Sequence, residues 1–328
     1  MENLIIYGVG MGLNAVNYVD YWQYIEERYR IKAIVDGNSS LEGKEIDIRG
    51  RKYKVITNNQ SFWLENLNCY VYITANKFYS EIKKDLLGKG VMEKHILKKN
   101  FLEDEYLSLK FSDEYIYGKG IEIGGPSSIF KSIYQSCISC DDVDFAIETI
   151  WNKNKLTDTF VLEDGTVLGK RFIADATDLH LIGTEIYDFV LSSNNIEHMA
   201  NPLKAILEFI RILKNGGSLI VVVPNKVYNF DHNREDTLFS HIKEDFNNNM
   251  LEDDLKHLDE ILEKHDLGMD MEMTFDEFKS RSLNNYCNRC LHHHVFSLKL
   301  LKDIAQYFEL DIKELGEVFG DFYMVAVK

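Results

Sequence analysis

The sequence predicts an α/β protein of two tandem, doubly wound parallel sheets, one after the other along the chain. Its 328 residues suit two ordinary domains better than one. Short apolar strands alternate with helical stretches, which is typical of parallel sheets. This alternation begins twice, at LIIYGVG (4–10) and again at YGKGIEIGGPS (117–127).

The composition is that of a soluble protein with substantial cores. Hydrophobic residues make up 45% of the chain and prolines number only 3, so we expect little disorder. No apolar run reaches the roughly 18 residues that a membrane helix needs, and the N-terminus lacks the basic stretch of a signal peptide. We therefore expect a cytoplasmic protein that does not bind a membrane. A formal charge of −16 without a basic stripe argues against binding to nucleic acid.

The first half, residues 1–104, is expected to form the smaller domain, and a linker is expected over 105–117. The second strand of this half is buried and ends at Asp36. The expected elements are, in order, a strand at 4–10, a helix to about 29, a strand at 31–36, a strand at 69–74 and a helix over about 76–88.

The second half, residues 118–328, repeats the pattern with more strands. Asp164-Gly165 predicts a hairpin before the third strand. A helix over 201–214 has its apolar residues on one face and is stopped by Gly216-Gly217. The expected strands are 120–125, 136–142, one ending at Asp175, 186–193 and 218–224, followed at the end of the chain by an antiparallel pair that turns near Gly320.

A helical insertion is expected after the fifth strand, over 225–296. Leucines recur at helical spacing between 251 and 262, and TFDE at 274–277 is a capping box. Seven of the chain's 10 histidines lie between His232 and His294. This concentration predicts a lid over a binding site.

Small and polar residues follow four successive strands of the second half. The carboxyl ends of parallel strands meet at one edge of the sheet, where open α/β sheets bind ligands. Glycines after the first strand let a ligand approach the backbone, and the next helix presents free N–H groups at its N-terminus. A carboxylate after the second strand is placed to accept hydrogen bonds from both hydroxyls of a ribose. The residues are Glu122, Gly124, Gly125, Pro126 and Ser127 after the first strand, Asp141 and Asp142 after the second, Asp175 and Ala176 after the third, and Asn194 and Asn195 after the fourth.

In these segments the chain resembles class I S-adenosylmethionine-dependent methyltransferases. The resemblance covers about 118–328 and rests on IEIGGPS, DATDL, YDFVLSSNNIEHMANPLKAI and ILKNGGSLIVVVP, with Pro126-Ser127 in the place of the family's third glycine. It implies S-adenosylmethionine as the cofactor and a class I methyltransferase fold, so that both halves are Rossmann-like. The implied cofactor site has Gly124 and Gly125 along the methionine portion, Asp141 or Asp142 on the ribose, Asp175 and Ala176 at the adenine, and Glu122, Pro126, Ser127 and Asn194 around them.

A narrower resemblance concerns the insertion. NFDHNRED, HLDEILEKHDL and NRCLHHHVF are similar to segments of a bacterial, methyltransferase type 11-like subgroup associated with surface-polysaccharide biosynthesis. The resemblance implies O-methylation of a small-molecule acceptor, namely a sugar, a nucleotide sugar or another phosphorylated glycan precursor. Methylation of a non-sugar small molecule stays open as an alternative. So do a NAD-dependent nucleotide-sugar enzyme and a non-catalytic binding module.

Methyl transfer to a hydroxyl requires that the acceptor be aligned and its proton removed, and a histidine of near-neutral pKa is the natural base. His198 follows the fourth strand, beside the implied position of the methyl group. His232, His292 and His294 of the insertion are the other candidates, and His292 or His294 is expected to face the acceptor opposite His198.

Four residues are candidates for binding the acceptor. Arginine forms paired hydrogen bonds with phosphate or carboxylate, so Arg234 and Arg289 are expected to bind an anionic part of it. Asn195 and His241 complete the expected acceptor site.

CNRCLHHHVF (287–296) raises the question of a metal site, because five potential ligands fall within eight residues. Cys137 and Cys140 would complete a four-cysteine zinc site, but a three-residue offset on a strand sends their side chains to opposite faces. Three consecutive histidines do not easily converge on one ion, since neighbours in an extended segment point apart. We therefore expect a metal-free segment with Cys287 and Cys290 as packed thiols.

The first half carries its own glycine pattern, Gly8, Gly10 and Gly12, with Leu13 where a dinucleotide fingerprint has a third small residue. Asp36 follows about where a ribose carboxylate would lie. This half resembles the small Rossmann-like domain found ahead of some sugar acyltransferases and methyltransferases of glycan pathways. The resemblance implies a domain for substrate docking or for contact within a homodimer, and bound NAD is the alternative.

Overall fold

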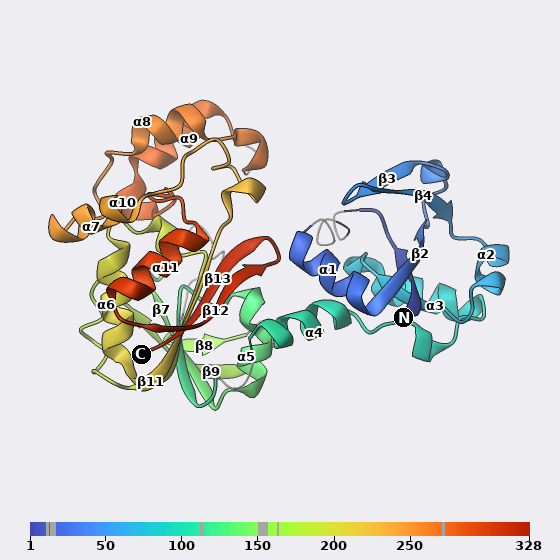
Figure 1. Ribbon diagram of the computed structural model, residues 1–328, viewed down its shortest axis with the longest axis horizontal. Coiled ribbons are helices and arrows are strands. Elements are labelled where there is room, and N and C mark those ends of the chain that lie inside the picture. Colours follow the sequence, from blue (N-terminus) through green and yellow to red (C-terminus); the bar gives the residue numbers. More distant parts are fainter. Residues whose placement is uncertain (11–12, 14–17, 112–114, 150–156, 163, 271–272) are drawn as a thin grey trace. The chain divides into compact units, whose positions relative to one another are not determined.

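The computed structural model confirms the predicted class, an α/β protein with two parallel-rich sheets (Figure 1). The chain divides into two compact units, Met1–Lys110 and Phe111–Lys328, each with its own sheet. No helix in the described part of the chain is long and apolar enough to cross a membrane. The structure describes residues 1–10, 13, 18–111, 115–149, 157–162, 164–270 and 273–328.

The first unit contains a five-stranded sheet in the order β3-β4-β2-β1-β5. Four of its strands run parallel, and β3 pairs antiparallel with β4 at the edge. The strands are β1 (Glu2–Tyr7), β2 (Tyr29–Asp36), β3 (Glu45–Ile48), β4 (Arg51–Thr57) and β5 (Tyr70–Ile73). The helices are α1 (Val19–Arg28), α2 (Gln60–Glu65), α3 (Tyr79–Gly88) and α4 (Phe101–Lys110).

Helix α4 is tied to the first unit by hydrogen bonds between side chains. Tyr72 donates to Glu103, and Tyr24 of α1 donates to Glu105. Residues 105–110, which the sequence places in a linker, therefore belong to a helix that is anchored on this unit.

The second unit contains an eight-stranded sheet in the order β12-β13-β11-β10-β6-β7-β9-β8. Its five parallel strands have the 3-2-1-4-5 order of a doubly wound sheet, and the chain changes direction across the sheet between β6 and β10. The predicted hairpin and the closing antiparallel pair are confirmed as β8-β9 and β12-β13. The strands are β6 (Lys119–Ile123), β7 (Ser139–Asp144), β8 (Thr159–Val161), β9 (Val167–Ile173), β10 (Tyr187–Ser193), β11 (Leu213–Val223), β12 (Asp311–Val318) and β13 (Asp321–Val327).

Helix α6 (Pro202–Ile212) shows how the core of this unit forms. Asn201 caps the helix by accepting a hydrogen bond from the backbone N–H of Lys204 at 3.1 Å. Leu203 and Ile206 on the apolar face are buried in the same core as the central strands. The other helices outside the insertion are α5 (Lys131–Ser136) and α11 (Leu298–Tyr307).

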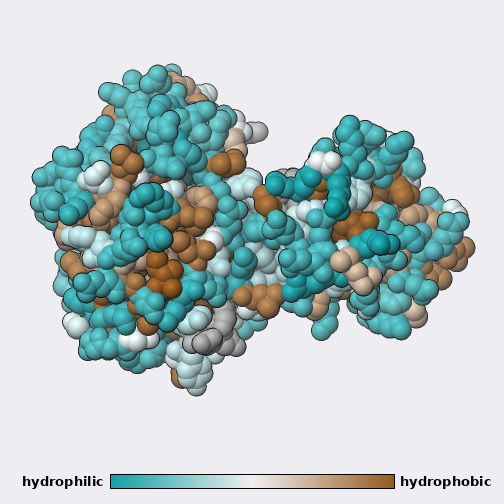
Figure 2. Space-filling model, viewed as in Figure 1, coloured by the Kyte–Doolittle hydropathy of each residue, from teal (hydrophilic) through white to brown (hydrophobic). Residues whose placement is uncertain are grey.

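Residues 225–296, called the lid below, have a small core of their own around Ile261, Phe278 and Leu291. Thr274 and Glu277 form the predicted capping box. Figure 1 shows α8 and α9 beyond one end of the sheet, and Figure 2 shows mainly hydrophilic residues over their outer side. The lid helices are α7 (Phe239–Asn247), α8 (Leu258–Lys264), α9 (Phe275–Leu283) and α10 (Asn285–Asn288).

Candidate active site

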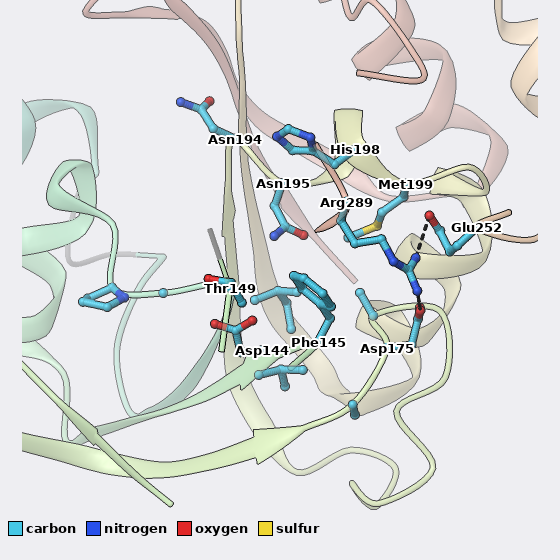
Figure 3. Close-up of a pocket in the computed structure, with 17 residues that line it drawn as sticks. Asp144, Phe145, Thr149, Asp175, Asn194, Asn195, His198, Met199, Glu252 and Arg289 are labelled. Atoms are coloured by element: carbon cyan, nitrogen blue, oxygen red, sulfur yellow. Dashed lines mark hydrogen bonds and ion pairs between the residues drawn. The ribbon is translucent and has the colours of Figure 1, made fainter. Parts of the chain in front are cut away.

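A cavity of about 310 Å³ lies at the carboxyl ends of β6, β7, β9 and β10 (Figure 3). This is the switch point of the parallel order, where open α/β sheets bind ligands. The lid contributes two of the lining residues. The cavity is lined by Ile123, Gly124, Gly125, Pro126, Val143, Asp144, Phe145, Thr149, Ala174, Asp175, Ala176, Asn194, Asn195, His198, Met199, Glu252 and Arg289.

Gly124 brings the turn after β6 close to the loop after β10. Its φ is +83°, in the left-handed region that favours glycine, and a Cβ there would lie 2.4 Å from Asn195 Nδ2. The backbone N–H of Gly124 donates to the carbonyl of Val143 at 2.7 Å, which ties the turn to β7. Gly125 and Pro126 continue the cavity wall. A ligand can therefore approach the backbone of this turn closely.

Glu122 lies behind the turn and does not line the cavity. Its carboxylate accepts hydrogen bonds from the backbone N–H of Ser127 at 3.1 Å and from the Tyr134 hydroxyl at 2.5 Å. Burial raises the pKa of Glu122 to about 8, against these hydrogen bonds, which lower it. Ser127 does not line the cavity either, so both residues shape the turn from behind.

We expect the contribution of Glu122 to the free energy of unfolding to fall as the pH rises from 4.5 to about 8, its ordinary and folded pKa values. A group with a raised pKa stabilises the folded state below its unfolded pKa, and this stabilisation is lost as the pH rises through the folded pKa. Glu122 contributes at most about 1.4 kcal/mol per pH unit to this slope. Urea unfolding of the wild type and of Glu122→Gln, which stays neutral, measures the contribution. Equal slopes in the two proteins would contradict it.

Asp141 and Asp142, one of which was expected to hold a ribose, do not line the cavity. β7 continues two residues beyond its predicted end and stops at Asp144. Asp141 accepts hydrogen bonds from the backbone N–H of Lys170 at 2.9 Å and from the Tyr187 hydroxyl at 2.7 Å. Its carboxylate therefore joins neighbouring strands.

Asp142 forms a buried ion pair. Its Oδ2 lies 2.5 Å from Arg171 Nε, and its Oδ1 accepts a hydrogen bond from the backbone N–H of Gly125 at 2.9 Å. Burial raises the pKa of Asp142 to about 6, against the guanidinium and the N–H, which lower it. Asp142 thus supports the glycine turn without reaching the cavity.

Asp144 is the carboxylate that β7 presents to the cavity, and Phe145 lines the wall beside it. Neither is predicted from the sequence, because the strand was expected to end at 142. Side chains alternate along a strand, so Asp142 and Asp144 share a face, but only the last residue reaches the edge of the sheet. The signal in the sequence that could have indicated Asp144 is that it is the third acidic residue of DDVDF.

Arg289 connects the lid to the sheet beside the cavity. Its guanidinium nitrogens lie 3.1 Å from Asp175 Oδ2 and 2.7 Å from Glu252 Oε2, as Figure 3 shows. Ala176 follows Asp175 in the wall. The structure brings Arg289 to the cavity, but two carboxylates already balance its charge.

Asn194 and Asn195 both contribute to the wall after β10, with different side-chain directions. Asn195 points into the cavity, whereas Asn194 points away from it (Figure 3). The Asn194 amide donates to Asp321 Oδ2 at 3.4 Å. Asn195 is therefore the one whose amide can contact a ligand.

Two imidazoles meet beside the cavity. His198 lines it, and its ring centroid lies 4.6 Å from that of His292. Nδ1 of His198 is 3.2 Å from the carbonyl oxygen of Leu291, and Nδ1 of His292 is 2.6 Å from Asp231 Oδ2. Burial, with His292 adding to it, lowers the pKa of His198 to about 3. His198 is therefore neutral at pH 7.

Glu197 is a buried carboxylate that was not predicted from the sequence, although it precedes His198 directly. Neither of its carboxylate oxygens has a hydrogen-bond partner among the residues that the structure describes. Its Oε1 lies 3.8 Å from His198 Nε2. Burial raises the pKa of Glu197 well above its usual range, and the carboxylates of Asp321 and Asp231 raise it further.

Residues 123–221 match the model of a family described as a methyltransferase domain. The matched segment runs from the end of β6 into β11 and contains most of the cavity wall. This segment is therefore an S-adenosylmethionine-dependent methyltransferase domain.

Solved structures of S-adenosylmethionine-dependent methyltransferases are similar to the chain at low identity. One from Mesorhizobium loti is 10% identical, with a TM-score of 0.41, over 70% of this chain and 97% of that chain. One from Aquifex aeolicus is 13% identical, with a TM-score of 0.38, over 68% of this chain and 88% of that chain. A search of the curated proteins finds no match.

The lid of the methyltransferase holds a second group of histidines. His241, His257 and His294 bring one ring nitrogen each within 4.8 Å of one another. His241 Nε2 lies 3.0 Å from His257 Nε2, and His294 Nε2 lies 3.0 Å from Asp245 Oδ2. None of the three lines the cavity, so the predicted site residues His241 and His294 are not brought to it.

Two further predicted residues lie outside the cavity. His232 is partly exposed, with its Nε2 2.9 Å from Asp266 Oδ2. Arg234 is buried, donates to the carbonyl oxygen of His292 at 2.8 Å and lies 2.9 Å from Asp231 Oδ1. Arg234 therefore positions Asp231 and His292, and its guanidinium does not face a ligand.

The two groups of metal-ligating side chains that come together in the described part of the chain contain no cysteine. Cys290 is buried, as expected. The same expectation is wrong for Cys287, which is exposed because α10 turns Asn285 inward and Cys287 outward.

In the first unit, Asp36 accepts hydrogen bonds from the backbone N–H groups of Val9 at 2.9 Å and Asn38 at 2.8 Å. Gly12, part of the predicted glycine pattern, lies outside the described residues. Binding of NAD by this unit stays a prediction.

Proposed function

We propose that the methyltransferase acts on a hydroxyl of a sugar, a nucleotide sugar or another phosphorylated glycan precursor. The observation that carries the hydroxyl acceptor is the imidazole of His198 in the cavity wall, against which the ring of His292 packs from outside the wall. A hydroxyl must lose its proton during transfer, and an imidazole beside the reacting atom is suited to assist this. The sugar is supported by the resemblance of NFDHNRED and NRCLHHHVF to the polysaccharide-associated subgroup.

In this proposal the methionine part of the cofactor passes Gly124, where the wall would not tolerate a Cβ. Asp144 accepts hydrogen bonds from the ribose hydroxyls, in place of Asp141 or Asp142. Phe145 packs against the adenine, whose edge faces Ala176. When bound, the cofactor supplies a methyl group on a sulfonium whose sulfur leaves as a neutral thioether.

The lid excludes water from the reaction. Arg289 closes the adenine end through its contacts with Asp175 and Glu252. Excluding water strengthens the electrostatic interactions inside the site. At the other end, Asn195 aligns the acceptor, and His198 and His292 act on its hydroxyl. Arg234 is buried, and Arg289 is paired with two carboxylates. We therefore assign neither arginine to the anionic group of the acceptor.

The proposal also includes a cytoplasmic location, a homodimer and a first unit that docks the substrate. These parts rest on the sequence.

Two measurements test the proposal. Calorimetry should detect binding of S-adenosylhomocysteine, and binding of NAD alone would contradict a methyltransferase. S-adenosylmethionine with a deuterated methyl group, incubated with nucleotide sugars and sugar phosphates, should label a sugar oxygen, which mass spectrometry detects. Label found only on a non-sugar molecule would replace the proposed acceptor.

Exchange of single histidines then tests the site. We expect His198→Gln and His292→Gln each to lower turnover by at least about 100-fold, the lower end of the contribution of a proton-transferring group. His232→Gln is the matched control, since this histidine lies outside the cavity and pairs with Asp266 rather than packing against His198 as His292 does, and it should keep wild-type turnover. Wild-type turnover in both His198→Gln and His292→Gln would remove these imidazoles from the mechanism.

A further inference from the structure

We propose that Glu197, His198 and His292 bind a divalent cation of the Zn²⁺ class beside the cofactor cavity. One ligand atom of each lies within 4.8 Å of the others. Two imidazoles and one carboxylate are the protein ligands of many catalytic zinc sites and of related first-row metals, and such sites leave coordination positions open for a substrate. Two ligands come from the short turn Ile196–His198 after β10, and the third comes from the segment between α10 and α11.

The surroundings of Glu197 favour a positive charge. The residue is 1% exposed, and its two carboxylate oxygens have no hydrogen-bond partner among the described residues. Two further carboxylates, those of Asp231 and Asp321, interact with it electrostatically. A buried carboxylate without a counter-charge is costly, and a bound cation would offset that cost.

Both imidazoles are held in the orientation of metal ligands. Metal-binding histidines almost always direct their second ring nitrogen to a carboxylate or a backbone carbonyl. His198 directs Nδ1 to the carbonyl oxygen of Leu291, and His292 directs Nδ1 to Asp231. Asp231 is in turn held by Arg234 at 2.9 Å. In the proposed site each ring coordinates through Nε2, the nitrogen that these two contacts do not use.

One pair of ligand atoms is close to the spacing that a cation needs, and all three atoms lie within 4.8 Å of one another. Around a zinc with bonds of 2.0–2.1 Å, tetrahedral ligands are about 3.3 Å apart. Glu197 Oε1 and His198 Nε2 are 3.8 Å apart. Closing this gap takes a shift of about half an ångström, which a change of side-chain torsions provides.

The second histidine group is a poorer cation site. His241, His257 and His294 surround Asp245, but this carboxylate is ion-paired with the ammonium of Lys256. A positive charge is therefore already present. No such lysine or arginine pairs with Glu197 among the described residues.

The proposed site is compatible with the argument that three consecutive histidines, here 292–294, do not converge on one ion. Only His292 of the three consecutive histidines contributes to it. Its neighbours point elsewhere, His293 to the Asn285 amide at 3.0 Å and His294 to Asp245. The other ligands come from the loop after β10, which the chain brings to the same place only in the folded state.

The role of the cation rests on the proposed function, whereas its binding does not. A cation at this position binds the hydroxyl oxygen of the acceptor and lowers its pKa. With the cation bound, His198 and His292 act through it as its ligands and do not accept the proton themselves. The hydroxyl then releases its proton to solvent, and the oxygen forms a bond to the methyl carbon. The sulfur keeps the electron pair of the bond that breaks. The products are a methyl ether, S-adenosylhomocysteine and a proton.

The first test uses the wild-type chain, purified without a metal-affinity tag and treated with a chelator. Titration with Zn²⁺ in a calorimeter should show a single tight site. After loading with Cu²⁺, pulsed electron paramagnetic resonance should count two coordinated imidazoles. A count of three would place the cation at His241, His257 and His294 and overturn the proposal, as would the absence of Zn²⁺ binding.

The second test uses variants. Glu197→Gln and His292→Gln should each weaken Zn²⁺ binding by more than about 100-fold, and Asp231→Asn, which acts through His292, by about 10–100-fold. His257→Gln is the matched control and should bind Zn²⁺ like the wild type. Wild-type affinity in Glu197→Gln and His292→Gln, or a loss in His257→Gln, would overturn the proposal.

Binding of S-adenosylhomocysteine by the same proteins separates this proposal from the proposed function. Variants that lose Zn²⁺ but still bind S-adenosylhomocysteine are folded and support the cation site. Zn²⁺ binding by a wild-type chain that does not bind S-adenosylhomocysteine would support the cation site while the proposed function fails. If the variants do not fold, the imidazole count in the wild type decides.

Discussion

Asp144→Ala should weaken the binding of S-adenosylhomocysteine by about 100-fold. Asp144 is the last residue of β7 and lines the cavity, where its carboxylate can accept hydrogen bonds from two neighbouring ribose hydroxyls. Hydrogen bonds to a charged group contribute about 1.5–3 kcal/mol each, and about 1.4 kcal/mol corresponds to a factor of ten in affinity. Calorimetry at constant pH and salt measures the difference.

Asp141→Ala is the matched control for this experiment. Asp141 lies on the same strand but is engaged with Tyr187 and Lys170 outside the cavity. The folded Asp141→Ala variant should therefore bind S-adenosylhomocysteine with wild-type affinity. The opposite result, with affinity lost in Asp141→Ala and kept in Asp144→Ala, would restore the assignment made from the sequence.

Asp142→Ala should instead lower the free energy of unfolding by about 3–5 kcal/mol. It removes one partner of a buried ion pair and leaves the guanidinium of Arg171 buried without a counter-charge. It also removes the acceptor of the Gly125 N–H, so cofactor binding weakens through the turn. Urea unfolding measures the change in stability.

An exposed ion pair provides the comparison. Lys313 and Asp311 are 2.6 Å apart at the surface, and Asp311→Ala should cost less than about 1 kcal/mol. The double variant Asp142→Ala/Arg171→Leu should recover part of the loss, because no unpaired charge then remains buried. A cost for Asp142→Ala as small as that of Asp311→Ala would mean that the buried pair contributes nothing.

Much of the fold could be predicted because its signals are local. IYDFVLSS is apolar enough to be a buried strand, and β10 runs over Tyr187–Ser193. Asp164-Gly165 marks the turn between β8 and β9. The predicted ends of two elements differ from the observed ones. β7 extends to Asp144, beyond its predicted end at 142, and α6 stops at Ile212, before its predicted end at 214. An end depends on where neighbouring strands and helices stop packing against an element, which one segment does not reveal.

The site was predictable as a place and only partly as a set of residues. Gly124, Asn195, His198 and Arg289 are in the cavity wall, where the sequence placed them. Arg234, in contrast, is buried in the lid. Its charge suggested a ligand, but the pairing that neutralises it, with Asp231, forms only in the folded lid.

By itself, the sequence determined that this chain is an α/β protein and predicted a crevice after β6, β7, β9 and β10, because the succession of strands along the chain and the glycine turns are local patterns. Only the tertiary structure decided which carboxylate reaches the cavity and which imidazole packs against His198 in its wall. Asp142 and Asp144 lie two positions apart on the same face of one strand. His198 and His292 are separated by 94 positions in the sequence. Side-chain direction at a strand end and contact between distant segments are set by packing in three dimensions, so no window of sequence contains them.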